Sequence, residues 1–280
     1  MTATNPYIPR LSFLFDFDKT LAGDSLNALL GVLGIDREAF DADYIAPLGD
    51  GWDKFLRRGH AILTLARDRG ITLDEGLFRE AALSNPLFPE VCDMPARLRT
   101  RAAEVHRGTQ VTVGILSSGF IELIAPTAIG RAVDTIAAAA FHFEDGRAVA
   151  VRRTITHGEK ALHLRAHAEG RSARDTNSPG ASADVVAPRD MHVLYDQMCY
   201  VGDGVSDLQA FGYLEDRGGL TIAVADGGAF AYEDRQSVTQ RVENLAPPDY
   251  SDGSELMESL LAAATAGAAR IRLRSMGDGE

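Results

Sequence analysis

Short apolar runs alternate with longer stretches of helical spacing along this chain of 280 residues. The runs lie at 11–15, 111–116, 135–141, 198–201 and 220–224. Short apolar runs separated by helical segments are typical of parallel strands whose two faces are both covered by helices. The pattern therefore predicts an α/β fold with three layers, in which a parallel sheet lies between two layers of helices.

An insertion separates the first two runs. About ninety residues lie between them, far more than the dozen or so that a parallel crossover needs. The segments 25–33, 52–68 and 73–83 have apolar positions at helical spacing and lack strand alternation. We therefore expect a small helical module at 23–89, inserted into a core formed by 1–22 and 90–280.

Three further segments have a recognisable local pattern. Asp145 and Gly146 stand between two alternating stretches, which is a strong hairpin signal. Residues 170–188 are rich in Ser, Ala, Asp and Pro and predict a surface loop. Residues 254–274 predict an Ala/Leu-rich helix near the end of the chain.

Composition and charge exclude some functions. The formal net charge of −12 opposes nucleic-acid binding, which depends on Lys and Arg at the phosphates. No apolar run before Asp16 is long enough for a signal sequence or a membrane span, so we expect a cytoplasmic protein without a membrane anchor. Cys92 and Cys199 lack the spacing of a metal or redox motif, and we expect both to be small buried hydrophobes.

Unusual polar residues follow the apolar runs. Ligands of parallel sheets bind at the carboxyl ends of the strands, and Asp16 and Asp18 stand directly after the first run. Two carboxylates this close repel each other unless a cation or a shared proton holds them together. The alternative is an acidic turn that merely ends the strand.

The second run ends in Ser117, Ser118 and Gly119 and then enters a helix-like segment. A hydroxyl group and free backbone N–H groups at the start of a helix form an anion site. An ordinary N-cap or turn is the alternative interpretation.

A lysine stands in the first turn of another predicted helix. Thr156 and Glu159 fit a capping box, which places Lys160 at the positive end of the helix dipole. That placement is unfavourable by roughly 0.3–1 kcal/mol, and a nearby anion would explain it. A solvated lysine on an exposed helix face is the alternative.

The run at 198–201 leads into a glycine-rich acidic segment that contains Asp203 and Asp207. The flanking glycines permit close approach of the backbone, and the two carboxylates offer the hard oxygen ligands that suit Mg²⁺. The alternative is a plain glycine-rich turn.

Together the four elements resemble the haloacid dehalogenase superfamily. Its motifs, an Asp-x-Asp-x-Thr-Leu start, a strand ending in Ser or Thr, a lysine and a Gly-Asp-Gly-x-x-Asp element, occur here in that order between about residues 11 and 224. The pattern is most similar to the phosphoserine phosphatase-like branch. The resemblance implies a Rossmann-like core with a helical cap and a Mg²⁺-dependent hydrolase that acts on phosphoric monoesters.

The resemblance also implies roles for individual residues. Asp16 would be the nucleophile that is transiently phosphorylated, and Asp18 would be the general acid and base. Mg²⁺ would be held by the Asp16 carboxylate, the Asp18 backbone carbonyl and Asp203, with Asp207 as a ligand or as support. The dehalogenases of the superfamily lack the second aspartate, so the resemblance favours a phosphatase.

The phosphoryl group would be bound by Ser117, by the backbone N–H groups of Ser118 and Gly119, and by Lys160. Three departures from the phosphoserine phosphatases argue against phosphoserine itself as the substrate. Ser118 replaces a glycine, Ser206 replaces an asparagine, and the region of Asp24 lacks a glutamate. Asp24 could contact a substrate amine or could stabilise a turn.

Within the insertion, Trp52, Lys54, Arg57, Arg58 and His60 form a cationic and aromatic cluster. The cluster could contact the leaving group, or it could simply solvate a helix face. We expect residues 24–87 to set substrate choice and to close over the bound substrate.

The expected partner is a small phosphorylated metabolite, and the sequence does not specify an oligomeric state. Two alternatives to hydrolysis remain open at this stage. They are phosphoryl transfer to a second alcohol on the same fold, and phosphate binding without catalysis.

Overall fold

The computed structural model describes residues 6–171, 186–225 and 242–277. Seven strands form one sheet in the order β4-β3-β2-β1-β5-β6-β7. They are β1 (Arg10–Phe15), β2 (Gln110–Phe120), β3 (Thr135–Glu144), β4 (Arg147–Arg153), β5 (Met198–Gly202), β6 (Leu220–Val224) and β7 (Asn244–Ala246). Only β4 pairs in the antiparallel sense. The five apolar runs are all strands, and the predicted parallel sheet is confirmed.

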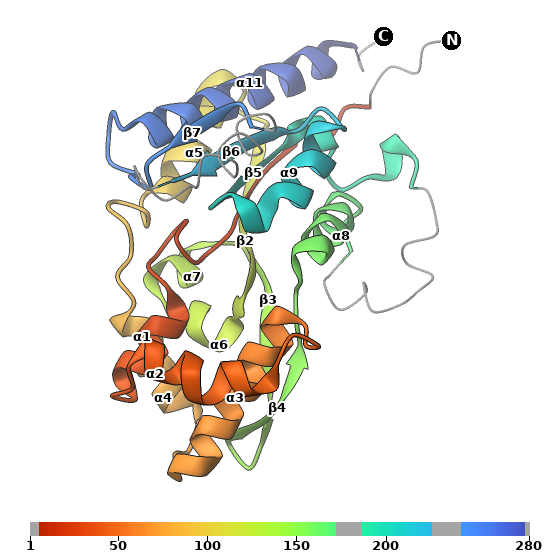
Figure 1. Cartoon of the computed structure of the whole chain (residues 1–280). Helices are drawn as coiled ribbons and strands as arrows, with labels where there is room; N and C mark the ends of the chain where they lie inside the picture. The colour runs from red at the N-terminus through yellow and green to blue at the C-terminus, as the bar shows by residue number, and fades with distance from the viewer. Residues whose placement is uncertain (1–5, 172–185, 226–241, 278–280) are drawn as a thin grey trace.

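Helices cover both faces of the sheet, as Figure 1 shows. On one face lie α5 (Met94–Val105) and α11 (Glu255–Gly277), and on the other lie α8 (His157–Ala168) and α9 (Leu208–Glu215). Leu11, Phe13 and Phe15 of the central strand belong to one apolar core, whereas Leu14 belongs to another. Because side chains alternate across a strand, β1 is buried on both faces, and the three-layer prediction is confirmed.

The β3–β4 hairpin was also predicted correctly. Its turn residues Asp145 and Gly146 both have positive φ angles, of 49° and 76°. A two-residue turn of this kind requires positive φ at both central positions, which explains the Asp-Gly pair. The short β7 was not predicted, because its three residues lack an apolar run.

Between β1 and β2 the chain is helical, as expected. Before α5, the helices are α1 (Ser25–Val32), α2 (Arg37–Phe40), α3 (Lys54–Arg69) and α4 (Glu75–Ser84), with a π-helical turn at Asp41–Ile45 and a 3-10 turn at Ala46–Leu48. The side chains of Asp24, Asp53 and Asp74 cap α1, α3 and α4. These helices gather at the end of the molecule away from α11 (Figure 1). They share an apolar core with Phe120 and Phe141 of the sheet.

Other expectations have mixed outcomes. The helix predicted at 254–274 is α11, whereas most of the loop predicted at 170–188 lies outside the described residues. Cys199 is buried as expected, but Cys92 is exposed, so that part of the prediction is wrong. Cys92 lies in a turn before α5 and not on its apolar face. In the described part of the chain, no helix combines the length and the apolar composition that crossing a bilayer requires.

Helix α3 lies close to the sheet at Gly59. A Cβ atom at this position would lie 2.4 Å from Val151 Cγ2 on β4 and 2.9 Å from Phe120 Cζ on β2. Such contacts are too short for any side chain, and the β-branched Val151 has little freedom to move away. The absence of a side chain at Gly59 therefore sets how closely the inserted helices pack on the hairpin.

The tight seam between α3 and the sheet at Gly59 can be tested with a matched pair of substitutions. In a helix, Gly→Ala ordinarily stabilises by about 0.5–1 kcal/mol. Gly31 in α1 has open space around it, so Gly31→Ala should raise the free energy of unfolding. We expect Gly59→Ala to lower it by about 1–3 kcal/mol, the usual cost of overpacking. Urea unfolding followed by circular dichroism measures both, and stabilisation by both substitutions would contradict the tight seam.

Candidate active site

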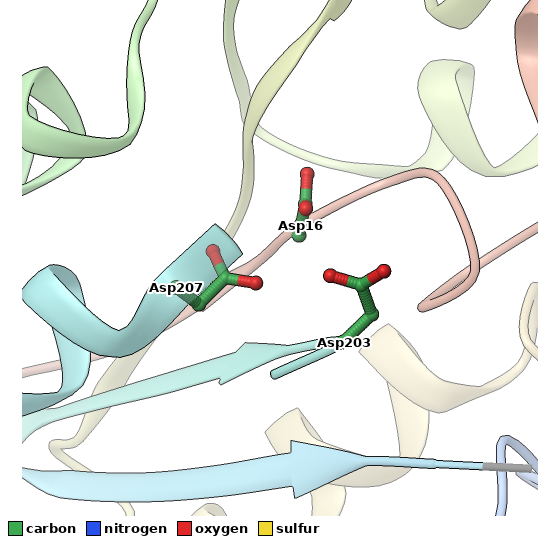
Figure 2. Close-up of side chains that lie close together, drawn as sticks. All are labelled: Asp16, Asp203 and Asp207. Atoms are coloured by element: carbon green, nitrogen blue, oxygen red, sulfur yellow. The ribbon is translucent and has the colours of Figure 1, made fainter. Parts of the chain in front are cut away.

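Three carboxylates converge at the carboxyl ends of the two central strands (Figure 2). Asp16 follows β1, Asp203 follows β5, and Asp207 lies in the turn that leads into α9. Each offers an oxygen, and these oxygens all lie within 4.8 Å of one another. Asp16 is held in place because its backbone N–H donates to the Val201 carbonyl at 2.8 Å and its Oδ1 accepts from the backbone N–H of Phe17 at 2.7 Å. The sequence-predicted acids are thus brought together.

A buried lysine joins two of these acids. Lys160 Nζ lies 2.8 Å from Asp16 Oδ2 and 2.6 Å from Asp207 Oδ1, and its side chain is fully buried. The Tyr200 hydroxyl donates to the same Asp207 oxygen at 2.5 Å. The capping box of Thr156 and Glu159 is present as predicted. The anion expected near Lys160 is therefore this pair of carboxylates, and the solvated-lysine alternative is wrong.

The cluster carries more negative than positive charge. Burial raises the pKa of Asp16, and the charge of Asp207 adds to this, while Lys160 opposes it. Burial raises the pKa of Asp203 to about 7, with Asp16 and Asp207 contributing. For Lys160, burial alone would lower the pKa, but the two carboxylates raise it above its ordinary value. Three carboxylates thus lie within 4.8 Å of one another with one lysine beside them, and at this distance the like charges repel each other strongly.

Such a cluster fits a hard divalent cation. The donors are carboxylate oxygens within 4.8 Å of one another, and oxygen is the ligand that Mg²⁺ prefers. Asp207 Oδ1 already accepts from both Lys160 and Tyr200, and its Oδ2 accepts from Ser206 at 3.1 Å. Asp16 and Asp203 are therefore better placed than Asp207 to be direct ligands.

Asp18 is held apart from this cluster by another contact. Its two carboxylate oxygens accept from the backbone N–H of Ser25 at 2.8 Å and from the Ser25 hydroxyl at 3.1 Å. Burial, followed by the charge of nearby Asp24, raises the pKa of Asp18 to about 6. A carboxyl group with a pKa close to neutral can both give and take a proton, which suits a general acid and base.

A helix follows Ser117, Ser118 and Gly119 as predicted, but these three residues do not form its N-terminus. Strand β2 continues through these residues to Phe120, with irregular pairing to β3 after Leu116, and the following α6 (Ile121–Ile124) has only four residues. The N–H of Gly119 donates to Ser117 Oγ at 3.1 Å, so it is not free. The three residues nevertheless line the same cavity as Asp16. They reach it from a bulged strand end and not from a helix dipole.

The cavity in front of Asp16 has a volume of about 120 Å³. Its lining comprises Asp16, Asp18, Lys19, Asp24, Lys54, Phe55, Arg58, Ser117, Ser118, Gly119, His157, Asp203 and Ser206. An engineered cavity of about 150 Å³ is large enough for benzene, so this volume suits a small group.

The cationic cluster of the insertion divides into two parts. Lys54 and Arg58, together with Phe55, line the cavity. Trp52 instead stacks on His60 with ring centroids 4.8 Å apart, and Arg57 donates to the Gly49 carbonyl at 2.7 Å. Trp52, Arg57 and His60 are not part of the lining, so the expectation that they contact the leaving group is not supported.

Asp24 lines the cavity, so contact with a substrate amine stays a prediction beside the turn-stabilising alternative. Asp24 caps α1 by accepting from the backbone N–H of Asn27 at 3.0 Å, and it lies 3.8 Å from Arg37. The turn-stabilising role is thus present in the structure.

Sequence reasoning missed three residues of the site: Ser25, His157 and Tyr200. Ser25 holds Asp18, Tyr200 holds Asp207, and His157 lines the cavity. Position offered a signal for His157, because it stands three residues before Lys160 in the same helical turn. Tyr200 lies inside an apolar run, where an aromatic residue is ordinary, and gave no such signal.

No protein-family model matches the sequence, and no curated protein matches it. Solved structures do resemble it. A phospho-aspartyl intermediate analogue of phosphoserine phosphatase aligns with a TM-score of 0.55 and 16% identity, covering 90% of this chain and 97% of that one. A HAD family hydrolase from Salmonella enterica serovar Typhi aligns with a TM-score of 0.57 and 13% identity, covering 92% and 72%. At these identities the likeness establishes the fold, and the chain has the haloacid dehalogenase fold that its motifs indicated.

The crowding of charges predicts a stability effect at Asp203. The pKa of about 7 in the folded protein exceeds the ordinary 3.8, so ionisation of Asp203 weakens the fold as the pH rises from about 4 to 7. Asp203→Asn removes this penalty. In chelator, we expect it to raise the melting temperature, with a gain that grows up to about pH 7 and is constant above it.

Thermal unfolding at several pH values checks this expectation. Asp68→Asn on the exposed surface of α3 is the control and should change the melting temperature little at any pH. An equal gain from Asp203→Asn at pH 5 and pH 8 would show that repulsion between the carboxylates is not its cause.

Proposed function

We propose that this chain is a Mg²⁺-dependent phosphatase that hydrolyses a small phosphomonoester through an aspartyl phosphate on Asp16. The observation that carries the proposal is the buried Asp16, which is 2.8 Å from Lys160 and shares its cavity with a second, separately held carboxyl group, Asp18. A protein that only binds phosphate has little need for two carboxylates where an anion must sit.

In the proposed reaction, Asp16 Oδ attacks phosphorus while the bond from phosphorus to the ester oxygen breaks. Asp18 gives its proton to the departing alkoxide. Asp18 then takes a proton from a water molecule that attacks the aspartyl phosphate, which releases inorganic phosphate and restores Asp16. Dividing one difficult displacement into two is the advantage of covalent catalysis.

The residues of the core would orient the phosphoryl group. We propose that Lys160, the Ser117 hydroxyl and the backbone N–H of Ser118 bind its oxygens, while the N–H of Gly119 holds Ser117 Oγ in place. Asp16, the Asp18 backbone carbonyl and Asp203 would hold Mg²⁺, and Asp207 would support the site by fixing Lys160. When bound, the ion supplies positive charge that offsets the repulsion between a carboxylate nucleophile and a phosphoryl group of about −1.5 to −2.

We further propose that residues 23–89 form the cap of this enzyme, and that 1–22 and 90–280 form its catalytic core. The inserted helices leave the core directly after the loop that carries Asp16 and Asp18, and α3 brings Lys54 and Arg58 to the cavity. A module in this place can exclude water and contact the leaving group. The substrate would be a small phosphorylated metabolite.

The direct test is hydrolysis of a generic aryl phosphate with Mg²⁺ and with chelator. Turnover should require the ion and stop when it is removed. Undiminished turnover by a metal-free preparation would refute the mechanism. Adding a second alcohol and measuring phosphate release against transfer separates hydrolysis from the phosphotransferase alternative.

The two leading aspartates should behave differently when they are replaced. Asp16→Asn removes the nucleophile, so phosphoenzyme and turnover should both disappear. Asp18→Asn removes the acid and base, so turnover should fall by about 10²–10⁴-fold while phosphoenzyme still forms. Acid quench followed by mass spectrometry of the protein measures the phosphoenzyme. Near-normal turnover by Asp16→Asn would show that the nucleophile is misassigned.

Arg58 and Arg57 form a matched pair for testing the cap. Both are on α3, but only Arg58 lines the cavity. We expect Arg58→Met to change the relative kcat/KM values of phosphometabolite substrates by about 10–100-fold, which corresponds to the loss of one hydrogen bond to a charged group. Hydrolysis of the small aryl phosphate should stay within about threefold, because a group in the cap contacts only the leaving group. Arg57→Met should alter neither, and equal effects of the two substitutions would contradict recognition by this face of α3.

A further inference from the structure

Two polar atoms in the cavity of Asp16 are buried and have no hydrogen-bond partner within residues 6–171, 186–225 and 242–277. They are the hydroxyl of Ser118, a residue only 8% exposed, and Nε2 of His157. A buried polar group without a partner costs about 1–3 kcal/mol, and such groups are uncommon in folded proteins. Because both atoms line the cavity proposed for the substrate, a ligand is a natural source of the missing partner.

The His157 ring is held in a defined position. His157 is the first residue of α8, three residues before Lys160, and its ring meets Phe55 edge-on with centroids 5.1 Å apart. Burial lowers the pKa of His157, and the nearby charges of Lys54 and Lys160 lower it further. The ring is therefore neutral at physiological pH. Nε2 of a neutral imidazole donates or accepts according to its tautomer.

Ser118 supplies a second neutral group. The neighbouring Ser117 Oγ already accepts from the N–H of Gly119, whereas Ser118 Oγ has no protein partner among the described residues. A serine hydroxyl both donates and accepts. Together, Ser118 and His157 can satisfy a group that also does both.

Among common leaving-group substituents, a hydroxyl meets this requirement best. It donates and accepts at once, so it can bond to Ser118 and to either tautomer of His157. A carboxylate or a second phosphate only accepts, and an ammonium group only donates. The cavity volume of about 120 Å³ favours a small leaving group.

We propose that Ser118 Oγ and His157 Nε2 bind a free hydroxyl of the leaving group, so that the substrate is the monophosphate of a small polyol. This inference rests on the proposed function, because it assigns the leaving-group side of the same site. A site built around buried hydrogen-bonding groups discriminates strongly against an analogue that lacks the matching hydroxyl, since the protein atoms then stay unpaired.

Binding tests the proposal without requiring turnover. In Asp16→Asn with Mg²⁺, calorimetry compares glycerol 3-phosphate with propyl phosphate, which has the same carbon chain and no free hydroxyl. We expect glycerol 3-phosphate to bind about tenfold more tightly, or more, as the loss of one or two buried hydrogen bonds implies. Adding Ser118→Ala or His157→Phe should bring the ratio of the two affinities close to one. Equal affinities before these additions, or a ratio unchanged by both, would overturn the proposal.

Thr64→Val is the matched control. Thr64 Oγ1 is also buried without a partner, but it is not part of the cavity lining, so its loss should leave the ratio unchanged. A ratio that falls equally in this control would overturn the assignment to Ser118 and His157. If Ser118→Ala weakens both ligands equally, Ser118 contacts the phosphoryl group and the proposal fails for that residue.

A measurement without substitution at His157 guards against misfolding of the variants. In Asp16→Asn labelled with ¹⁵N-histidine, the Nε2 resonance of His157 should move when glycerol 3-phosphate is added and should move much less with propyl phosphate. Equal movement with both ligands would overturn the proposal. If the protein hydrolyses aryl phosphate but binds glycerol 3-phosphate and propyl phosphate equally, this inference fails and the proposed function stands. If the protein prefers the ligand with a hydroxyl in binding but hydrolyses no phosphate ester, this inference stands and the proposed function fails.

Discussion

The site depends on the buried ammonium group of Lys160, whose Nζ lies 2.8 Å from Asp16 Oδ2 and 2.6 Å from Asp207 Oδ1. It joins α8 on one face of the sheet to the end of β1 and to the turn that leads into α9. A buried ion pair is a weak source of net stability, but removing one member leaves an uncompensated charge that costs about 3–5 kcal/mol. The three elements are therefore fixed relative to one another by a group whose loss the fold tolerates poorly. Tyr200, which donates to Asp207, holds the far end of the same arrangement.

The sheet explains why so much of this site could be predicted from sequence. Asp16, Asp203 and Ser117 each follow or end an apolar run, and the ends of neighbouring parallel strands lie at one edge. The register pairs Phe15 with Val201, so the residues after them lie side by side. Lys160 was found from a conflict with the helix dipole, which is a local signal that needs no knowledge of the fold. The order and spacing of the motifs, together with the conflict between Lys160 and the helix dipole, were enough to predict the three acids and the lysine.

What could not be predicted depends on side-chain direction and on irregular backbone. Lys54 and Arg58 are one helical turn apart and share a face of α3, and Arg57, between them in sequence, turns to the Gly49 carbonyl. The sequence shows a cationic cluster but does not show which face meets the core. The strand through Ser117 and Ser118 is bulged, and its pairing with β3 shifts there, so these residues lie within β2 and not at the N-terminus of the helix that follows. Ser25 reaches Asp18 only because the loop after β1 turns back on itself, with Lys19 at a positive φ of 59°.

Charge balance links the two parts of the molecule. Asp16, Asp203 and Asp207 with Lys160 carry a formal charge of −2, which one divalent cation would neutralise. An incoming phosphoryl group then restores about the same excess of negative charge. Lys54 and Arg58 line the cavity and form no ion pair among the residues that the structure describes, so their charges are available to the leaving-group side of a substrate. Both come from α3, so in the proposed enzyme a polar leaving group would attract α3 toward the core. Closure of the inserted helices and binding of the substrate would then favour each other through this attraction, which strengthens as water leaves the cavity.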